Sequence, residues 1–326
     1  GCCEKGGKVM KGKEFLMKYS RILILVLIMA GVSVASPDFL KPSNLLNVAR
    51  QSSMLLIMSL GMTCAMLLGR GVDMSIGATL SLTSCVAAGF LRSNDTVGSV
   101  LMGIVIALVI GMFIGLINGV LISYLHLPAI LVTYGIREII RSVAFFYMDG
   151  DIISGFHKIV MFMGSGFAFG AIPTQIIIAL VLTVATAWML KHTRMGRELY
   201  VVGANPSAAK FSGLKAEKSV ILGFVLSGAL AALAGIVYLG RLGAAEAEIG
   251  NQFHFQCVSA VAIGGISFAG GAGSAWGAVI GALILNILIN GMNLLNISSY
   301  WQGTVNGVII IIAVLLDYVV RKKQTK

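Results

Sequence analysis

Long apolar runs dominate the chain and restrict the folds open to it. A membrane span needs roughly 20 mainly apolar residues to cross the bilayer core. Stretches that meet or approach this requirement are residues 21–37, 47–68, 75–92, 98–124, 128–148, 173–192, 219–240, 255–269, 274–296 and 303–320. Only 11% of the residues are charged, less than half of the roughly 25% that is usual in soluble domains. The sequence therefore predicts an all-α integral membrane protein with about ten transmembrane helices.

Glycines mark two features within these runs. The run 255–269 is short and overlaps the glycine-rich "GGISFAGGAGSAWG". A re-entrant segment near 255–273 is therefore an alternative to a full span, and eight spans with two re-entrant segments is an alternative count. Gly111, Gly115 and Gly119 recur at every fourth residue of a longer run, the spacing of small residues that lets two helix backbones approach closely.

The net charge of +11 is concentrated beside the apolar runs, which predicts how the chain is oriented. Basic residues cluster before the first run, after the last run and within 193–218. Cytoplasmic loops of membrane proteins carry such clusters. We therefore expect a cytoplasmic segment 1–20, one transmembrane domain over 21–320 and a cytoplasmic tail 321–326. The segment 149–172 is expected on the extracytoplasmic side.

The sequence lacks the residue patterns that are typical of several functional classes of protein. No basic face with interleaved aromatic residues suggests nucleic-acid binding, and the five cysteines have no spacing typical of metal ligands. There is no phosphate-binding G-x-x-x-x-G-K-[ST] loop, and no H-E-x-x-H or G-x-S-x-G motif. We therefore expect a transporter with no catalytic residue, metal or cofactor of its own, rather than an enzyme.

Few ionisable residues lie near the apolar runs. Their number indicates whether such a transporter is coupled to an ion gradient. Ion-coupled carriers place costly charged groups deep in their helices. Here Glu138 and Arg141 are three residues apart and are expected to pair with each other. Asp317 lies near the end of the last run, and Asp73 follows Arg70 between two runs. An ion-coupled secondary transporter is therefore the less favoured class.

The polar stretch "ELYVVGANPSAAKFSGLKAEKS" lies between two spans and predicts one short capped helix. Asn205 suits the N-cap, and Pro206 suits the first helical position, where its missing N–H costs nothing. Gly213 can take the left-handed conformation that ends a helix. A helix this short is marginal alone, so we expect it to pack against something. The candidates are a soluble partner and the protein's own surface or the lipid headgroups.

Four segments, taken together and in order, carry a family resemblance over nearly the whole chain. They are "GMTCAMLLGRGVDMSIGATLSL", "LPAILVTYGIREIIRS", "HTRMGRELYVVGANPSAAKFSGL" and "VSAVAIGGISFAGGAGSAWGAVIGALILNILINGMNLL". They resemble the permease subunits of bacterial ATP-binding-cassette importers for simple sugars, of the ribose/xylose type. The sequence departs from the family pattern at Arg70, where a small residue is usual, and at His254 and Gln256, where acids are common. These departures concern which sugar is carried.

The resemblance implies a multi-pass permease of the bacterial plasma membrane, with both termini cytoplasmic, that imports a monosaccharide. A quorum-signal sugar or a nucleoside is the alternative solute. The implied partners are an ABC ATPase subunit, an extracytoplasmic sugar-binding protein, a second permease chain (the same or a paralogue) and membrane lipid, with no nucleic acid. ATP and Mg would bind to the ATPase subunit, and no cofactor to this chain.

The resemblance also implies site residues. Segment 193–218 would be the coupling loop that fits a cleft in the ATPase, with the implied residues Gly196, Arg197, Gly203, Asn205, Pro206, Ala208, Ala209, Ser212 and Gly213. Candidates for the pathway or its structural support are Asp73, Ser75, Gly77, Thr133, Arg141, Gly264, Gly265, Asn290 and Asn293. For Asp73 three roles are open: a cap for the following helix, which we favour because an Asp there accepts N–H bonds, an ion pair with Arg70, or direct contact with the sugar.

Overall fold

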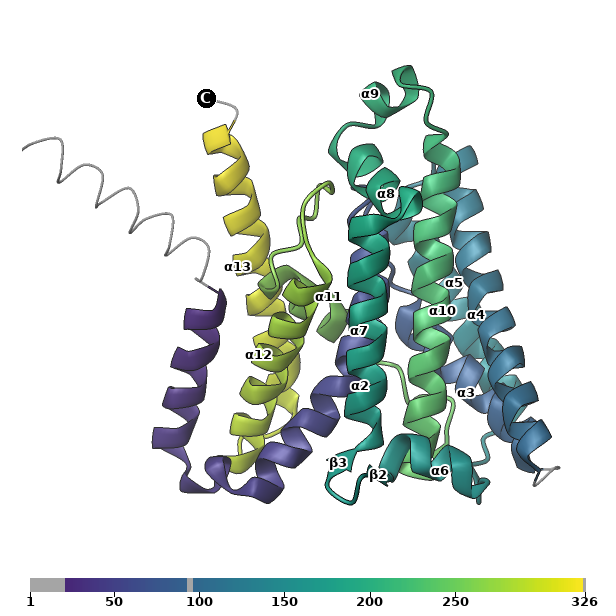
Figure 1. Ribbon diagram of the computed structural model, residues 1–326, viewed down its shortest axis with the longest axis vertical. Helices are drawn as coiled ribbons and strands as arrows, with labels where there is room; N and C mark the ends of the chain where they lie inside the picture. The colour runs from purple at the N-terminus through teal and green to yellow at the C-terminus, as the bar shows by residue number, and fades with distance from the viewer. Residues whose placement is uncertain (1–20, 93–95, 325–326) are drawn as a thin grey trace, which may run out of the picture.

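The computed structural model describes residues 21–92 and 96–324, and most of them are helical (Figure 1). The helices that coincide with the predicted runs are Arg21–Ala35, α2 (Pro42–Met66), α3 (Ile76–Arg92), α4 (Val97–Tyr124), α5 (Ala129–Met148), α7 (Thr174–His192), α10 (Ala216–Leu242), α11 (Phe253–Ile263), α12 (Ala275–Leu294) and α13 (Tyr300–Gln324). Among these, α4, α7, α10 and α12 are long and apolar enough to cross a membrane. A helical membrane protein is therefore supported, while the count of ten spans stays a prediction.

The two ends of the helical bundle carry different connections (Figure 1). At one end, α8 (Arg194–Ala204) and α9 (Pro206–Phe211) join α7 to α10. The other end carries α6 (Lys158–Ser165) and the antiparallel pair β2 (Phe167–Ala168) and β3 (Ile172–Pro173). The remaining short elements are η1 (Pro37–Leu40) and the antiparallel pair β1 (Ile153–Ser154) and β4 (Ala244–Ala245). The connection between α7 and α10 and the segment after α5 thus lie at opposite ends.

The core of the bundle depends on close contact between α4 and α10. A Cβ added to Gly115 of α4 would lie 2.2 Å from the carbonyl oxygen of Phe224, and one added to Gly111 would lie 2.4 Å from that of Gly228. Gly119 meets the α10 backbone in the same way. The close packing predicted from the spacing of these three glycines is therefore confirmed, because only a hydrogen side chain leaves room for these contacts.

Helix α11 is too short to cross the bilayer. Its 11 residues span about 16 Å at 1.5 Å per residue, roughly half of the hydrocarbon thickness. It packs closely on α12, since a Cβ on Gly281 would lie 1.8 Å from the carbonyl oxygen of Ala260, and one on Gly264 would lie 2.3 Å from that of Gly277. The segment predicted near 255–273 is therefore a short helix followed by a turn.

Candidate functional site

The connection between α7 and α10 forms two capped helices, where the sequence predicted one. Thr193 caps α8 by accepting a hydrogen bond of 3.0 Å from the backbone N–H of Gly196. Asn205 caps α9, because its Oδ1 accepts a bond of 2.9 Å from the backbone N–H three residues later. Pro206 is the first residue of α9, and Gly213 after its end has a φ of 79°. The predicted capping of α9 is confirmed, and α8 was missed.

One aromatic side chain dominates the exposed face of α9. Phe211, the last residue of α9, is 94% exposed, and α9 lies at the extremity of the molecule (Figure 1). Pro206 and Ala208 are exposed beside it. Ala209, by contrast, is fully buried against the rest of the protein, so it supports α9 from inside and is not part of an outward contact face.

Backbone contacts hold α8 against the membrane helices. A Cβ on Gly203 would lie only 1.8 Å from the carbonyl oxygen of Leu67, at the end of α2. The same carbonyl accepts a hydrogen bond of 2.9 Å from the backbone N–H of Gly271, in the turn before α12. A Cβ on Gly270 of that turn would lie 2.3 Å from the backbone nitrogen of Gly69. We call these five residues the glycine junction, because three segments touch there through their backbones.

Side-chain and backbone contacts also fix the rest of α8. A Cβ on Gly196 would lie 2.2 Å from a carbonyl oxygen in the last turn of α7. Arg197 donates a bond of 3.0 Å to the carbonyl oxygen of His192. The hydroxyl of Tyr200 donates a bond of 3.0 Å to the carbonyl oxygen of Gly273. Burial raises the pKa of the Tyr200 phenol, so it stays a protonated donor.

A buried polar cluster lies around the connection between α2 and α3. The Oδ1 of Asp73 accepts bonds from the backbone N–H of Ser75 (3.0 Å) and from its hydroxyl (2.6 Å), and Oδ2 accepts one from the hydroxyl of Ser227 on α10 (2.6 Å). Asn118 of α4 donates to the Ser75 hydroxyl at 2.8 Å. We call these four residues the Asp73 cluster. Within the described residues no ion pair joins Asp73 to Arg70, and the carboxylate instead accepts the backbone N–H of Ser75, just before α3 begins.

Thr133 and Gly77 hold the same region in place. The hydroxyl of Thr133, on α5, accepts a bond of 3.0 Å from the backbone N–H of Met74. A Cβ on Gly77 would lie 2.2 Å from the carbonyl oxygen of Gly250, whose N–H donates a bond of 2.8 Å to the Ser81 hydroxyl. The start of α3 is therefore fixed to α5 and to the segment before α11.

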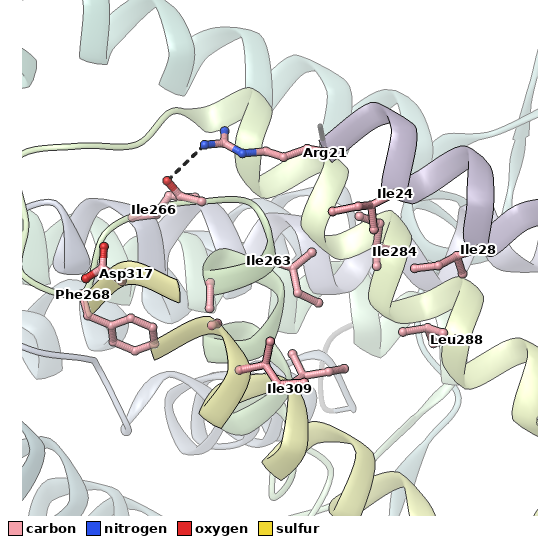
Figure 2. Close-up of a pocket in the computed structure, with 14 residues that line it drawn as sticks. Arg21, Ile24, Ile28, Ile263, Ile266, Phe268, Ile284, Leu288, Ile309 and Asp317 are labelled. Atoms are coloured by element: carbon pink, nitrogen blue, oxygen red, sulfur yellow. Dashed lines mark hydrogen bonds between the residues drawn. The ribbon is translucent and has the colours of Figure 1, made fainter. Parts of the chain in front are cut away.

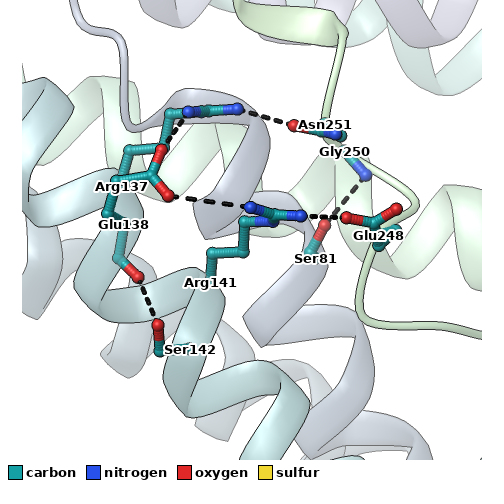
Figure 3. A network of polar contacts seen from close by, with 8 residues as sticks. All are labelled: Ser81, Arg137, Glu138, Arg141, Ser142, Glu248, Gly250 and Asn251. Atoms are coloured by element: carbon teal, nitrogen blue, oxygen red, sulfur yellow. Dashed lines mark hydrogen bonds and ion pairs between the residues drawn. The ribbon is translucent and has the colours of Figure 1, made fainter. Parts of the chain in front are cut away.

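An ion-pair network joins α5 to the segment before α11 (Figure 3). Arg141 pairs with Glu248, and also with Glu138 at 3.7 Å. Arg137 pairs with Glu138 and donates a bond of 2.6 Å to Asn251 Oδ1. The predicted pairing of Glu138 with Arg141 is confirmed. Two cations thus face two anions, and this pairing lowers the free-energy cost of burying charged side chains among the membrane helices.

The remaining predicted residues belong to separate helix–helix contacts. Asn290 of α12 and Asn44 of α2 exchange hydrogen bonds of 3.0 and 2.9 Å. Asn293 Oδ1 accepts a bond of 3.2 Å from Gln302 of α13. Gly265, with a φ of 72°, lies against the side chain of Arg21. The structure does not bring these residues together with Asp73 in one site.

A partly polar cavity that the sequence did not suggest lies between α11 and α13. Its volume is about 680 Å³, and its lining includes Gln252, Phe255, Tyr300, Gln302 and Asn306. The Oδ1 of Asn306 is buried, with no hydrogen-bond partner in the described part of the chain. Amide and aromatic side chains of this kind leave donors, acceptors and a ring face for a small polar solute.

The sequence matches a model of a transport family. Residues 44–314 match the family described as "branched-chain amino acid transport system / permease component". The chain belongs to this family. It is 37% identical over 316 residues to the ribose import permease of Escherichia coli K12, covering 96% of each chain. The identity is 38% over 314 residues to the ribose import permease of Bacillus subtilis, covering 95% of this chain and 94% of the relative.

A further relative is named for a different sugar. The D-allose transport system permease of Escherichia coli K12 is 33% identical over 315 residues, covering 94% of each chain. No solved structure matches the chain. The protein is thus a membrane permease of ATP-binding-cassette transporters and not an enzyme, and its apolar helices indicate a multi-pass protein of the inner membrane. Permeases of such importers work with an ATPase and a binding protein.

Several residues of the permease that shape these sites were missed from the sequence. Asn118 and Ser227 are polar residues inside apolar runs, and that isolation was the available signal. Glu248 lies before the short run 255–269, and no local pattern pairs it with Arg141. Gln302 and Asn306 are four residues apart in the first turns of α13, a spacing that places both amides on one helix face.

Proposed function

We propose that the protein is the permease subunit of an ATP-driven importer that moves a monosaccharide of the ribose or xylose type into the cytoplasm. The main observation behind this proposal is that α9 exposes Phe211. The connection that contains α9 also contacts the membrane helices at the glycine junction. The relatives support a sugar as the substrate, since they are named for ribose and D-allose and match nearly the whole chain.

In this proposal α9 is the coupling helix that a separate ATPase subunit grips. Phe211 would enter an apolar cleft of the ATPase, because a 94% exposed aromatic side chain is the kind of anchor that dominates an interface. The capped ends keep the short helix formed, and buried Ala209 fixes it to the bundle. Movement of the ATPase would then displace α8, and the glycine junction would pass the displacement to α2 and to the turn before α12.

The proposed topology has ten crossings with α11 and the turn after it counted as one, and with both termini on the cytoplasmic side. The end bearing α8 and α9 is the proposed cytoplasmic end. Segment 149–172 lies at the opposite end, where an extracytoplasmic sugar-binding protein would dock. A second permease chain, identical or paralogous, completes the proposed importer.

The cavity between α11 and α13 is the proposed wall of the sugar path. Amide side chains are costly against lipid, so half-buried Gln302 and its neighbours would face a water-filled path closed by the second permease chain. Phe255 is 48% exposed and Tyr300 92% exposed. Their rings can stack on the apolar face of a pyranose or furanose, while Gln252 and Asn306 can bond its hydroxyls.

Other functions remain as alternatives. The description of the family model names branched-chain amino acids, so a permease for such an amino acid is the second candidate. The lining described above favours the sugar, because an amino-acid zwitterion requires charged or strongly oriented polar partners, and the lining residues of this cavity are uncharged. A quorum-signal sugar or a nucleoside would fit the same neutral lining. An ion-coupled secondary carrier is less favoured, because the charges of α5 are already paired.

The proposal is tested by reconstituting the permease with the ATPase and binding protein encoded beside its gene. Proteoliposomes are loaded with ATP inside or outside, and uptake of labelled ribose, xylose, D-allose and leucine is measured with and without an uncoupler. We expect ATP-dependent uptake of one sugar, insensitive to the uncoupler and matched by sugar-stimulated ATP hydrolysis. Uptake of leucine alone would identify the second candidate, and uptake abolished by the uncoupler with ATP present would refute the ATP-driven class.

A further inference from the structure

A second polar pocket lies where the chain turns into α11, and its volume is about 350 Å³. This volume is within the roughly 300–1,000 Å³ that is typical of small-molecule sites. Four of its lining residues have a carboxylate or amide side chain: Glu248, Asn251, Gln252 and Gln256. We call it the 248–256 pocket. Gln252 also lines the cavity between α11 and α13, so the pocket adjoins the proposed sugar path.

Its polar lining distinguishes this pocket from the cavity beside the helix Arg21–Ala35, whose volume is about 540 Å³ (Figure 2). Most side chains that line the larger cavity are branched and apolar, among them Ile24, Ile263 and Ile284. Such a lining leaves the hydroxyls of a polar solute without partners, which is costly. A hydroxylated solute therefore finds more hydrogen-bond partners in the smaller pocket.

One carboxylate oxygen of the 248–256 pocket is open to a ligand. Glu248 pairs with Arg141 through Oε1 (Figure 3). A guanidinium presents its donors in a fixed fork, so this ion pair orients the carboxylate. In the part of the chain that the structure describes, Oε2 of Glu248 has no partner, and the side chain is 43% exposed. Oε2 is therefore an oriented acceptor.

The amide side chains add donors and acceptors beside this oxygen. Asn251 Oδ1 accepts a bond of 2.6 Å from Arg137. Because a guanidinium donates and cannot accept, the Nδ2 of Asn251 lies away from Arg137 and stays a donor for a ligand. Gln252 and Gln256 are four residues apart at the start of α11, where a backbone bond of 3.4 Å joins them. This spacing places both amides on one helix face.

We infer that the 248–256 pocket binds a neutral polyhydroxylated solute, and that Glu248 determines its specificity. The choice of a sugar rests on the proposed function. Oε2 of Glu248 would accept the hydrogen of one hydroxyl, while the amides of Asn251 and Gln256 would bond its neighbours on the ring. Ile249 and Phe253, which complete the lining, would face the C–H side of the ring.

The charge of the pocket disfavours other small solutes. Among the described residues that line it, Glu248 alone is charged, so a sugar phosphate or a sugar acid would meet like charge. A cation would compete with Arg141 for the same carboxylate. A neutral solute with several hydroxyls avoids both costs.

The pocket is tested by equilibrium binding to the purified permease in lipid nanodiscs, without the ATPase or the binding protein. The probes are D-ribose, D-xylose and D-allose, the 2-deoxy and 3-deoxy forms of each, ribose 5-phosphate and choline. We expect one sugar to bind about ten-fold more tightly than at least one of its deoxy forms, the size of one hydrogen bond to a charged group. Ribose 5-phosphate and choline should bind more weakly than that sugar.

Matched variants separate recognition by the pocket from stability of the ion-pair network. Glu248→Gln removes the charged acceptor and should weaken binding of the sugar about ten-fold. Gln256→Leu removes one amide, leaves both ion pairs of Arg141 intact and should also weaken binding. Glu138→Gln is the control, because it takes the other carboxylate from Arg141 but Glu138 does not line the pocket. Its affinity for the sugar should change by less than about two-fold.

The inference is overturned if Glu138→Gln weakens binding as much as Glu248→Gln does, because the effect would then come from the ion-pair network. It is also overturned if neither Glu248→Gln nor Gln256→Leu changes sugar binding, if choline binds as tightly as the sugar, or if none of the three sugars binds. ATP-driven sugar uptake alongside any of these results would leave the proposed function standing without this pocket. Binding that depends on Glu248, without ATP-driven uptake, would support the pocket and contradict the proposed function.

Discussion

Replacing Asp73 by leucine should destabilise the permease more than any exposed polar substitution. Asp73 is 2% exposed, and its carboxylate accepts three hydrogen bonds, from the N–H and hydroxyl of Ser75 and from the hydroxyl of Ser227. Leucine has a similar size but no acceptor. The three donors would then lie in a buried, apolar environment without the partner that now satisfies them.

The size of the effect follows from these donors. A buried donor left without a partner costs about 1–3 kcal/mol. The Ser227 hydroxyl can rotate toward a carbonyl of its own helix, so the expected cost comes from the two donors of Ser75. The expected loss for Asp73→Leu is therefore about 2–6 kcal/mol, a large share of the roughly 5–15 kcal/mol that stabilises a typical protein.

Asparagine should be tolerated at the same position. Its Oδ1 can accept both bonds from Ser75, and asparagine caps helices about as well as aspartate. Its Nδ2 would replace the oxygen that faces Ser227, whose hydroxyl can turn to accept. Asp73→Asn should therefore cost about 1 kcal/mol or less, and it should retain most transport.

Thermal unfolding of each variant in detergent, together with sugar uptake in vesicles, measures these differences. Ser165→Ala is the control, because the exposed Ser165 hydroxyl bonds only a carbonyl of its own helix, and the expected change is within about 0.5 kcal/mol. If Asp73→Asn is as damaging as Asp73→Leu, the negative charge itself is required, and the capping explanation is wrong.

Four other changes follow from the geometry described above. Phe211→Ala should leave insertion intact but lose roughly 2 kcal/mol of ATPase docking, measured as a roughly thirty-fold weaker association. Gly203→Val should uncouple ATP hydrolysis from uptake, because its Cβ would lie 1.8 Å from a carbonyl of α2; coupled transport in this variant would contradict the proposed role of the junction. Arg141→Glu should reduce stability by about 1 kcal/mol, and Glu248→Arg in the same chain should recover part of it. Met195→Cys should resist an impermeant thiol reagent in intact cells, and its labelling there would reverse the proposed topology.

The positions of the helices could be predicted well because the signals are local. Each long apolar run became a helix, and Asn205, Pro206 and Gly213 play the capping roles that their chemistry favours. Gly111 and Gly115 mark the face of α4 that meets α10, since only the spacing of small residues is needed to find a close contact.

Partners across the bundle could not be predicted in the same way. Asp73 and Ser227 are 154 residues apart in the chain, and no local pattern in one sequence links them. Arg141 was paired correctly with its neighbour on the helix, while its bond to Glu248 depends on how α5 meets the segment before α11. The resemblance put Ala209 among the residues that contact the ATPase, although it is buried, because a six-residue helix has too few residues to reveal which side is buried.

The connection between α2 and α3 links the two candidate regions of the permease. It begins at Leu67 in the glycine junction and reaches the Asp73 cluster within a few residues. Its Gly69 and Gly71 have φ values of 63° and 128°, which side chains rarely adopt, so the segment between the two fixed ends can bend without rotamer changes. The backbone contacts at one end cannot shorten, and the hydrogen bonds at the other hold α3, α4 and α10 together. A displacement of α8 can therefore reach α3, α4 and α10 through this connection, in addition to its direct contacts with α7 and α10.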